Sequence, residues 1–289
     1  MQARDIEKHV VKQYTFSERK ADNIMINIAI NGVCGRMGLR IATLVAEDKD
    51  LKLVAALEMK DHQHIGKDLS AIISRGHNDV IISDELNGSA DVLIDFTSPD
   101  STMSRLKVCA EKGIALVTGT TGLGSEQMEQ IEKASQTIPC LFSPNMSVGV
   151  NLLFNLVESV SKILSDDADI EIIESHHRYK KDAPSGTALK LAETICSATN
   201  REMDSVVIYG RKGFSGERPQ DQICIHSIRS GDIVGEHTVT FCNAGERLEL
   251  VHKAQTRDSF ALGSIRAAKF LAGKPPGLYS MKDALKDMC

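Results

Sequence analysis

Apolar residues follow two alternating patterns in the first half of the chain. Short apolar runs rich in β-branched residues are typical of buried parallel strands, and apolar residues spaced three or four apart are typical of helices. The short runs predict strands at Ile24–Ile30, Lys52–Leu57, Val80–Ser83, Ala90–Phe96, Ile114–Thr118 and Ile138–Phe142. The helical spacing predicts helices at Leu39–Glu47, Asp100–Glu111 and Ser125–Ser135. This alternation of strand and helix predicts a Rossmann-like, doubly wound α/β unit with a parallel sheet.

The pattern changes after Ser147. Helices are expected at Val148–Leu164 and Thr187–Ala198, with a strand at Asp169–Glu174 between them. Strands separated by glycine-bearing turns then follow near Ser205–Tyr209, Gln222–Arg229, Glu236–Cys242 and Arg247–Ala254. Helical spacing returns at Ser259–Leu271, which predicts that the chain packs back on the first unit.

We therefore expect three segments with different roles. Residues 1–23 are charged and weakly periodic, and are expected to form an N-terminal extension. Residues 24–147, completed by 258–289, are expected to form the doubly wound domain. Residues 148–257 are expected to form a second α+β domain with a mixed sheet.

Composition narrows the class of protein. The chain has 289 residues, 42% of them hydrophobic and 25% charged, which is typical of a soluble globular protein. A formal charge of −5 without a long basic block gives no electrostatic footprint for nucleic acid. No apolar run approaches the ~20 residues of a membrane span, and residues 1–23 are too polar for a signal peptide, so we expect a cytoplasmic protein.

The seven cysteines are dispersed, and no Cys-x-x-C pair or Cys/His cluster of zinc-ligand spacing occurs. Cytosolic thiols stay reduced. We therefore expect neither a structural disulfide nor a metal site.

A glycine-rich turn, Gly32-Val33-Cys34-Gly35-Arg36-Met37-Gly38, joins the first expected strand to the first expected helix. Glycines let backbone N–H groups approach a pyrophosphate, toward which the following helix directs its positive end. Glu58 ends the second strand about twenty positions further on, where an acidic residue accepts hydrogen bonds from ribose hydroxyls. The turn therefore predicts a dinucleotide site. Cys34 stands where the second glycine of the usual motif would fall, and a glycine-rich connection without a ligand is the alternative.

Three further strand ends carry small or polar residues: Phe96–Pro99, Gly119–Gly122 and Ser143–Met146. Ligands of parallel sheets bind beyond the carboxyl ends of the strands, so these segments predict a rim beside the glycine-rich turn. Each of them is also compatible with an ordinary turn, because such residues are turn formers.

The segment Glu174–Thr187, read as ESHHRYKKDAPSGT, concentrates candidate chemistry. We expect Asp182 to cap the helix that follows, with free backbone donors at Ser185, Gly186 and Thr187 forming an anion site. Histidine and lysine beside that site supply positive charge and protons near neutral pH. A solvated basic loop before an ordinary helix is the alternative.

Six segments together carry a family resemblance: Gly32–Gly38, Ile94–Thr97, Gly119–Gly122, Asn145–Gly149, Glu174–Ala188 and Gly231–His237. The pattern H-H-x-x-K-x-D-A-P-S-G-T among them is long and unusual. From about Ile26 to the C-terminus, the chain resembles the 4-hydroxy-tetrahydrodipicolinate reductase family, also called dihydrodipicolinate reductases.

The resemblance implies an oxidoreductase of the diaminopimelate route to lysine. It would transfer hydride from NAD(P)H to a cyclic dicarboxylate, with loss of water, and would assemble as a homotetramer through the second domain's sheet. The resemblance implies His176 as proton donor or acceptor and Lys180 as general acid, and substrate contacts are expected at His177, Ser185, Gly186 and Thr187. Cofactor contacts are implied at Gly32, Val33, Cys34, Gly35, Arg36, Met37, Glu58, Gly119, Thr120, Thr121, Ser143, Pro144, Asn145 and Met146.

One departure from the family bears on cofactor choice. Many relatives that accept NADPH carry an arginine directly after the acidic residue, whereas this chain has Met59 and then Lys60. Glu58 repels a 2′-phosphate, and only Arg36 or Lys60 is close enough in sequence to offset that repulsion. We therefore expect the use of both NADH and NADPH, with NADH at least as good.

Two other classes stay open at this point. An aspartate or homoserine dehydrogenase would share the layout but would not explain the HHxxK and PSGT spacing. A nucleotide-sensing protein without catalysis would leave His176 and Lys180 without a task.

Overall fold

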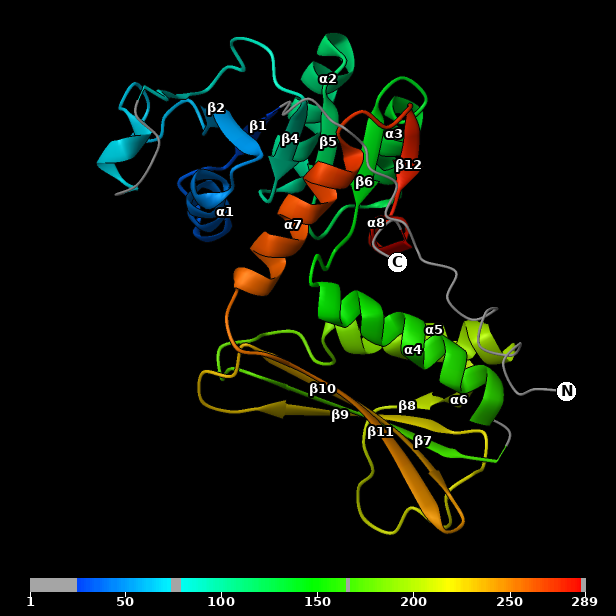
Figure 1. Cartoon of the computed structure of the whole chain (residues 1–289). Helices are drawn as coiled ribbons and strands as arrows, with labels where there is room; N and C mark the ends of the chain where they lie inside the picture. Colours follow the sequence, from blue (N-terminus) through cyan, green and yellow to red (C-terminus); the bar gives the residue numbers. More distant parts are fainter. Residues whose placement is uncertain (1–24, 74–78, 165–166, 287–289) are drawn as a thin grey trace, which may run out of the picture.

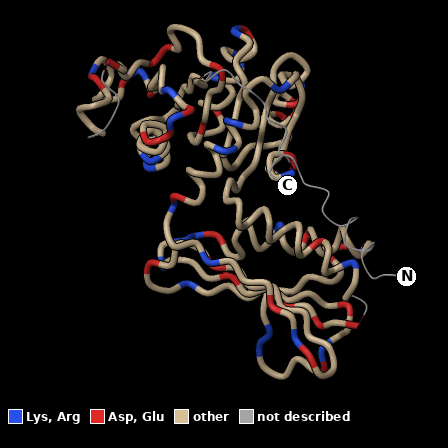
Figure 2. Tube along the Cα trace, viewed as in Figure 1, with Lys and Arg blue, Asp and Glu red and all other residues tan. Residues whose placement is uncertain are grey.

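The computed structural model describes residues 25–73, 79–164 and 167–286, and it contains two sheets, one above the other (Figure 1). The expected N-terminal extension at 1–23 and Cys289 lie outside the described residues. Lys and Arg, like Asp and Glu, are spread over both parts of the molecule (Figure 2). Among the described residues, no helix is both long and apolar enough to cross a lipid bilayer.

The first sheet confirms the doubly wound prediction. Its strands are β1 (Ile26–Asn31), β2 (Leu51–Leu57), β3 (Ile82–Ser83), β4 (Val92–Asp95), β5 (Ala115–Thr118), β6 (Pro139–Phe142) and β12 (Gly277–Tyr279). The order across the sheet is β12-β6-β5-β4-β1-β2-β3, and each neighbouring pair is parallel. Strand order reverses between β1 and β4, and ligands of such sheets bind beside that point.

Helices cover both faces of this sheet. Helices α1 (Arg36–Glu47) and α7 (Asp258–Leu271) lie on one face, and α2 (Pro99–Lys112) and α3 (Ser125–Ala134) on the other. Side chains of β1 alternate accordingly, because Ile28 and Ile30 join the core under α1 and α7, whereas Ala29 joins the core under α2 and α3. Burial on both faces explains why these strands read as continuous apolar runs.

The second sheet is mixed, as expected. Its strands are β7 (Asp169–His176), β8 (Val207–Ile208), β9 (Ile223–Arg229), β10 (Gly235–Asn243) and β11 (Glu246–Ala254). Strand β9 runs parallel to β7 and β8, and β10 runs antiparallel to β7 and β11. Helices α4 (Val148–Leu164) and α5 (Gly186–Thr199) cover the face toward the first sheet, and their apolar side chains form one core with β7, β9 and β10 (Figure 1).

The structure adds elements that the hydrophobic pattern did not predict. A short helix, α6 (Met203–Val206), occupies the start of the expected strand at Ser205–Tyr209, and a 3₁₀ turn lies at Leu69–Ala71. Strand β12 and helix α8 (Met281–Lys286) follow α7, and β12 extends the first sheet beside β6. Because the two sheets have separate cores, we propose the same domain division as before, with 24–147 and 258–289 in one domain and 148–257 in the other.

Candidate active site

The glycine-rich turn lies at the carboxyl end of β1, directly before α1. Gly35 is the N-cap of α1 and has no side chain to cap it, so the N–H groups of Arg36, Met37 and Gly38 have no acceptor within the described part of the chain. A Cβ on Gly38 would collide with the carbonyl oxygen of Gly32. A glycine at this position therefore allows α1 to pack closely against the end of β1. Unpaired donors at a helix start, approached closely by bare backbone, fit the pyrophosphate of a dinucleotide.

Glu58 lies one strand away, at the end of β2. Its Oε2 accepts a hydrogen bond from the Cys34 backbone N–H (3.1 Å), and its Oε1 accepts one from the N–H of Met59 (3.0 Å). A carboxylate has about four acceptor positions, so two remain for ribose hydroxyls. Burial, followed by the neighbouring Glu58 charge, raises the pKa of the Cys34 thiol to about 11, so this thiol stays protonated at neutral pH.

A buried carboxylate, Asp95, joins the loops that follow β4 and β5. It is 0% exposed, and its Oδ1 accepts hydrogen bonds from Asn31 Nδ2 and Thr97 Oγ1, both at 2.7 Å. Its Oδ2 accepts from Thr120 Oγ1 at 2.9 Å and from two further threonine hydroxyls. Asp95 therefore fixes the predicted cofactor loop at Thr120 relative to β1, a role that the sequence reasoning missed.

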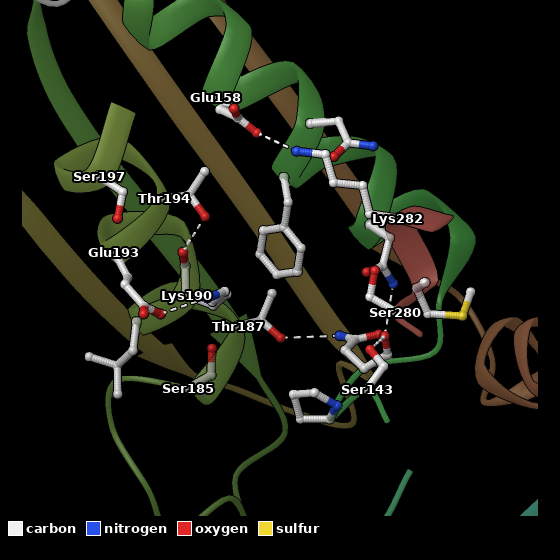
Figure 3. Close-up of a pocket in the computed structure, with 18 of the residues that line it drawn as sticks. Ser143, Glu158, Ser185, Thr187, Lys190, Glu193, Thr194, Ser197, Ser280 and Lys282 are labelled. Atoms are coloured by element: carbon white, nitrogen blue, oxygen red, sulfur yellow. Dashed lines mark hydrogen bonds and ion pairs between the residues drawn. The ribbon is translucent and has the colours of Figure 1, made fainter. Parts of the chain in front are cut away.

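A cleft of about 1280 Å³ lies between the two sheets, and Figure 3 shows side chains that line it. Predicted site residues from both domains line this cleft: Thr121, Ser143, Pro144, Asn145, His176, Lys180, Ser185, Gly186 and Thr187. The structure thus brings the last two predicted cofactor loops to the predicted catalytic segment, Glu174–Thr187. The glycine-rich turn, Glu58 and His177 are not among the residues that line it.

Three of the predicted cofactor residues have side chains that are almost completely buried. Val33 is 0%, Met146 1% and Thr120 2% exposed. Val33 and Met146 belong to the core under α1 and α7, and the Val33 backbone N–H donates to the carbonyl of Leu57 (3.0 Å). The side chains of Val33 and Met146 therefore anchor their loops in the core and do not face a bound cofactor.

The predicted catalytic segment begins inside β7, which extends two residues beyond its expected end. Glu174 points into the core and is 0% exposed. It accepts hydrogen bonds from His176 Nδ1 (2.6 Å), from the Ser185 backbone N–H (3.2 Å) and from both terminal nitrogens of Arg229 (2.7 and 2.8 Å). Burial raises the pKa of the Glu174 carboxyl, but hydrogen bonds from Arg229, Ser227 and His176 outweigh burial and lower it to about 2. Glu174 is therefore an anion that links the two ends of the segment.

The protonation of His176 follows from this contact. Because the Glu174 carboxylate accepts, Nδ1 carries the hydrogen, and Nε2 of the neutral ring is an acceptor. Burial lowers the pKa of His176 more than the Glu174 charge raises it, so the ring is neutral at neutral pH. Lys180 lies in the same cleft, with Nζ 2.9 Å from Asp182 Oδ2.

The start of α5 differs from the expectation in two ways. Ser185, and not Asp182, is the N-cap, because Ser185 Oγ accepts from the Ala188 N–H (3.2 Å) while the Asp182 carboxylate pairs with Lys180. The Ser185 N–H is not free, since it donates to Glu174. The N–H groups of Gly186 and Thr187 have no acceptor in the described ranges and are available to an anion.

A hydrogen bond joins the two walls of the cleft. Asn145 Nδ2 donates to Thr187 Oγ1 (3.2 Å, dashed in Figure 3), and Asn145 Oδ1 accepts from the Ser147 N–H (2.9 Å). The second contact fixes the orientation of the amide, so Thr187 Oγ1 is the acceptor in the first. The hydroxyl hydrogen of Thr187 therefore remains available to a bound carboxylate.

His237 packs behind His176 and was predicted only as part of a family segment. Its ring makes an edge contact with His176, with centroids 5.3 Å apart, and Nε2 lies 3.1 Å from Ser185 Oγ. Burial, followed by the proximity of His176, lowers the pKa of His237 to about 3. The segment Gly231–His237 therefore packs against the segment Glu174–Thr187 from the adjacent strand. The alternation of Ile170, Ile172 and Glu174 along the expected strand was the sequence signal that could have placed Glu174 on the buried face.

We expect His237 to make the fold acid-sensitive. Histidine in an unfolded chain titrates near pH 6.5, so below that pH the unfolded state binds a proton that the folded state excludes. This contribution is complete above pH 6.5 and is lost as the pH falls toward about 3, by at most about 1.4 kcal/mol per pH unit. Urea unfolding between pH 7 and 5 should show a shallower pH dependence in His237→Gln, by about one proton. An identical slope in both proteins would contradict the prediction.

Comparisons with known proteins cover nearly the whole described chain. The family models described as "Dihydrodipicolinate reductase, N-terminus" and "Dihydrodipicolinate reductase, C-terminus" match residues 26–146 and 149–285. The 4-hydroxy-tetrahydrodipicolinate reductases of Syntrophus aciditrophicus and Anaeromyxobacter sp. (strain Fw109-5) are 47% and 48% identical to it over 264 residues. Both matches cover 90% of this chain and 98% of the relative.

A solved structure of the same family also matches the chain. A dipicolinate-bound dihydrodipicolinate reductase from Paenisporosarcina sp. TG-14 superposes with a TM-score of 0.70 at 27% identity, covering 89% of this chain and 98% of that chain. An amine dehydrogenase from Mycobacterium smegmatis shares the fold alone, with a TM-score of 0.58 at 12% identity over 91% of this chain and 96% of its own. The chain therefore belongs to the dihydrodipicolinate reductase family.

Proposed function

We propose that the protein reduces 4-hydroxy-tetrahydrodipicolinate to tetrahydrodipicolinate, using NAD(P)H and releasing water, in the diaminopimelate route to lysine. The observation that carries the proposal is the cleft itself. It sets the cofactor loops at Thr121 and Ser143–Asn145 against a helix start and two candidate proton-transfer groups, His176 and Lys180. Relatives that match this chain over 98% of their own length carry this reductase name.

The cofactor would lie along the carboxyl edge of the first sheet. Glu58, the glycine-rich turn, the loop at Thr120 and the loop at Asn145 follow β2, β1, β5 and β6, which lie in this order across the sheet with β4 between β1 and β5. The ribose would contact Glu58 and the pyrophosphate the start of α1. A reduced nicotinamide bound at the cleft end of this row supplies the hydride.

The second domain would hold the dicarboxylate. The N–H groups of Gly186 and Thr187, at the positive end of α5, can donate to one carboxylate together with the Thr187 hydroxyl. Ser185 would act indirectly, because its own N–H and hydroxyl are used in fixing the start of α5. Rigid donors of this kind hold the ring still while charge develops on it.

Proton transfer would be divided between two residues. Hydride addition leaves negative charge on the conjugated ring system, and a proton must follow. His176 is neutral, with its only hydrogen directed to Glu174, so its Nε2 accepts hydrogen bonds. The Lys180 ammonium is therefore the proton donor that this geometry favours.

A coupled assay tests the proposal. Pyruvate and aspartate semialdehyde, condensed by the preceding synthase, supply the unstable substrate, and consumption of reduced nicotinamide is followed by absorbance. We expect turnover with this mixture, and no reduction of NAD(P)⁺ when aspartate or homoserine is supplied with the oxidised cofactor. The absence of turnover with the mixture, in protein that binds NADH, would favour the nucleotide-sensing alternative.

We expect NADH to be used at least as well as NADPH. Glu58 is 8% exposed and repels a 2′-phosphate, whereas Arg36 and Lys60 are exposed side chains that offset this repulsion in part. The ratio of kcat/KM for the two cofactors measures the preference. A value for NADPH more than tenfold above that for NADH would overturn the prediction.

The outer face of the second sheet supports a homotetramer. Ile173, Ile228 and Val251 are 38%, 46% and 50% exposed on β7, β9 and β11. Register places Ile173 and Val251 in one row, each paired with Thr238. Exposed apolar side chains gathered on one open sheet face are typical of subunit contacts. Light scattering should give a mass of four chains, and a monomer would exclude the assembly.

A further inference from the structure

Three side chains of the types that bind transition metals meet beside the glycine-rich turn. Cys34 follows β1, Glu58 ends β2, and His62 lies in the turn after β2. One ligand atom from each lies within 4.8 Å of the other two. Ligand atoms around a tetrahedral zinc are roughly 3.5 Å apart, so small side-chain rotations would close the set around an ion. Because Cys34 is distant in sequence from Glu58 and His62, residue spacing does not reveal this cluster.

Hydrogen bonds of the backbone N–H groups fix the chain segments that carry these ligands. The Cys34 N–H donates to Glu58 Oε2 (3.1 Å), and the Glu58 N–H donates to the carbonyl of Ser83 (2.9 Å). The turn that carries His62 is closed by its N–H, which donates to the carbonyl of Met59 (2.9 Å). Cys34 and His62 are half-buried, so an ion can reach them from solvent. A preorganised, accessible set loses little freedom when it binds.

The donor set selects the class of ion. The Cys34 thiol would release its proton to solvent when it binds an ion. A thiolate, an imidazole and a carboxylate together suit Zn²⁺ and similar ions, whereas Mg²⁺ and Ca²⁺ require oxygen ligands. Three protein ligands leave a fourth position for water. Glu58 is also the residue proposed to accept the ribose hydroxyls, so an ion and a dinucleotide would compete for one carboxylate.

We propose that Cys34, Glu58 and His62 form a Zn²⁺ site whose occupation excludes the dinucleotide. The competition rests on the proposed cofactor role of Glu58, whereas the metal site itself does not.

Co²⁺, a coloured substitute for Zn²⁺, tests the site directly. Titration of the metal-free full-length protein should give a thiolate-to-cobalt charge-transfer band that saturates at one ion per chain and disappears when Zn²⁺ is added. Cys34→Ser should abolish the band, and His62→Ala should weaken Co²⁺ binding at least tenfold. Cys242→Ser is the matched control, because Cys242 is the other half-buried free cysteine of the described chain and should leave the band intact. Absence of the band, or its persistence in Cys34→Ser, would overturn the site.

Kinetics test the competition. Zn²⁺ at ten times its dissociation constant should raise the KM for NADH about elevenfold and leave kcat unchanged. The same concentration should have no effect on Cys34→Ser. A cobalt band without any change in KM would overturn the competition and the assignment of Glu58 to the ribose, while the metal site would stand.

Discussion

Replacing Lys180 with methionine should lower kcat by about two orders of magnitude or more. General acids contribute about 10²- to 10⁴-fold to rate, and Lys180 lines the cleft together with His176 and can donate a proton while His176 is neutral. Methionine keeps most of the aliphatic length and removes the ammonium. Steady-state kinetics with saturating NADH and substrate would measure the loss.

Lys181→Met is the matched control for this variant. Lys181 is exposed, adjacent in sequence and not among the residues that line the cleft. Its replacement should leave kcat within about twofold, since surface substitutions of this kind change little. Added methylammonium should partly restore turnover in Lys180→Ala, because it supplies the missing acid, and should not affect the parent protein. Turnover of Lys180→Met close to that of the parent would exclude Lys180 as the proton donor.

The long periodic elements could be predicted from the sequence, because their own residues determine them. Helix α4 has the expected bounds, Val148–Leu164, and the parallel strands lie within a few residues of their apolar runs. Strand β12 and helix α8 have three and six residues, too few to show a period. Their formation depends on pairing with β6 and packing beside α7, which are contacts that no local pattern encodes.

The sequence indicated which residues lie together in the candidate site better than it indicated the hydrogen bonds and ion pairs between them. The segment Glu174–Thr187 predicted the helix start, and the structure places the predicted proton-transfer residues His176 and Lys180 in one cleft, yet the segment predicted the wrong cap. Asp182 has the chemistry of a cap, but its carboxylate pairs with Lys180 and its carbonyl accepts from Arg229 (2.7 Å). Arg229 comes from a strand 55 positions after Glu174, so the contact that organises the segment depends on the register of β7 and β9.

The contact between Arg229 and Glu174 should also be essential for stability. We expect Arg229→Met to lower the free energy of unfolding by about 3 kcal/mol at pH 7. The change leaves the Glu174 carboxylate, which is 0% exposed, charged and without its bidentate partner. Unpairing a buried charge costs about 3–5 kcal/mol, and the lower end applies because the Arg229 side chain is 19% exposed and water can enter the vacated space. Urea unfolding of both proteins measures the difference.

Two further measurements would assign that loss to the charge of Glu174. In the parent the pKa of Glu174 is lowered to about 2, so its contribution is complete above the unfolded value of about 4.5 and is lost as the pH falls from there toward 2. The gap between parent and Arg229→Met should therefore narrow over that range. Adding Glu174→Gln removes the unpaired charge and keeps one carbonyl oxygen, which can accept from either His176 Nδ1 or the Ser185 N–H, so the double variant should be more stable than Arg229→Met alone. A double variant that is less stable than the single variant would show that Arg229 acts mainly through its packing and its bond to the carbonyl of Asp182.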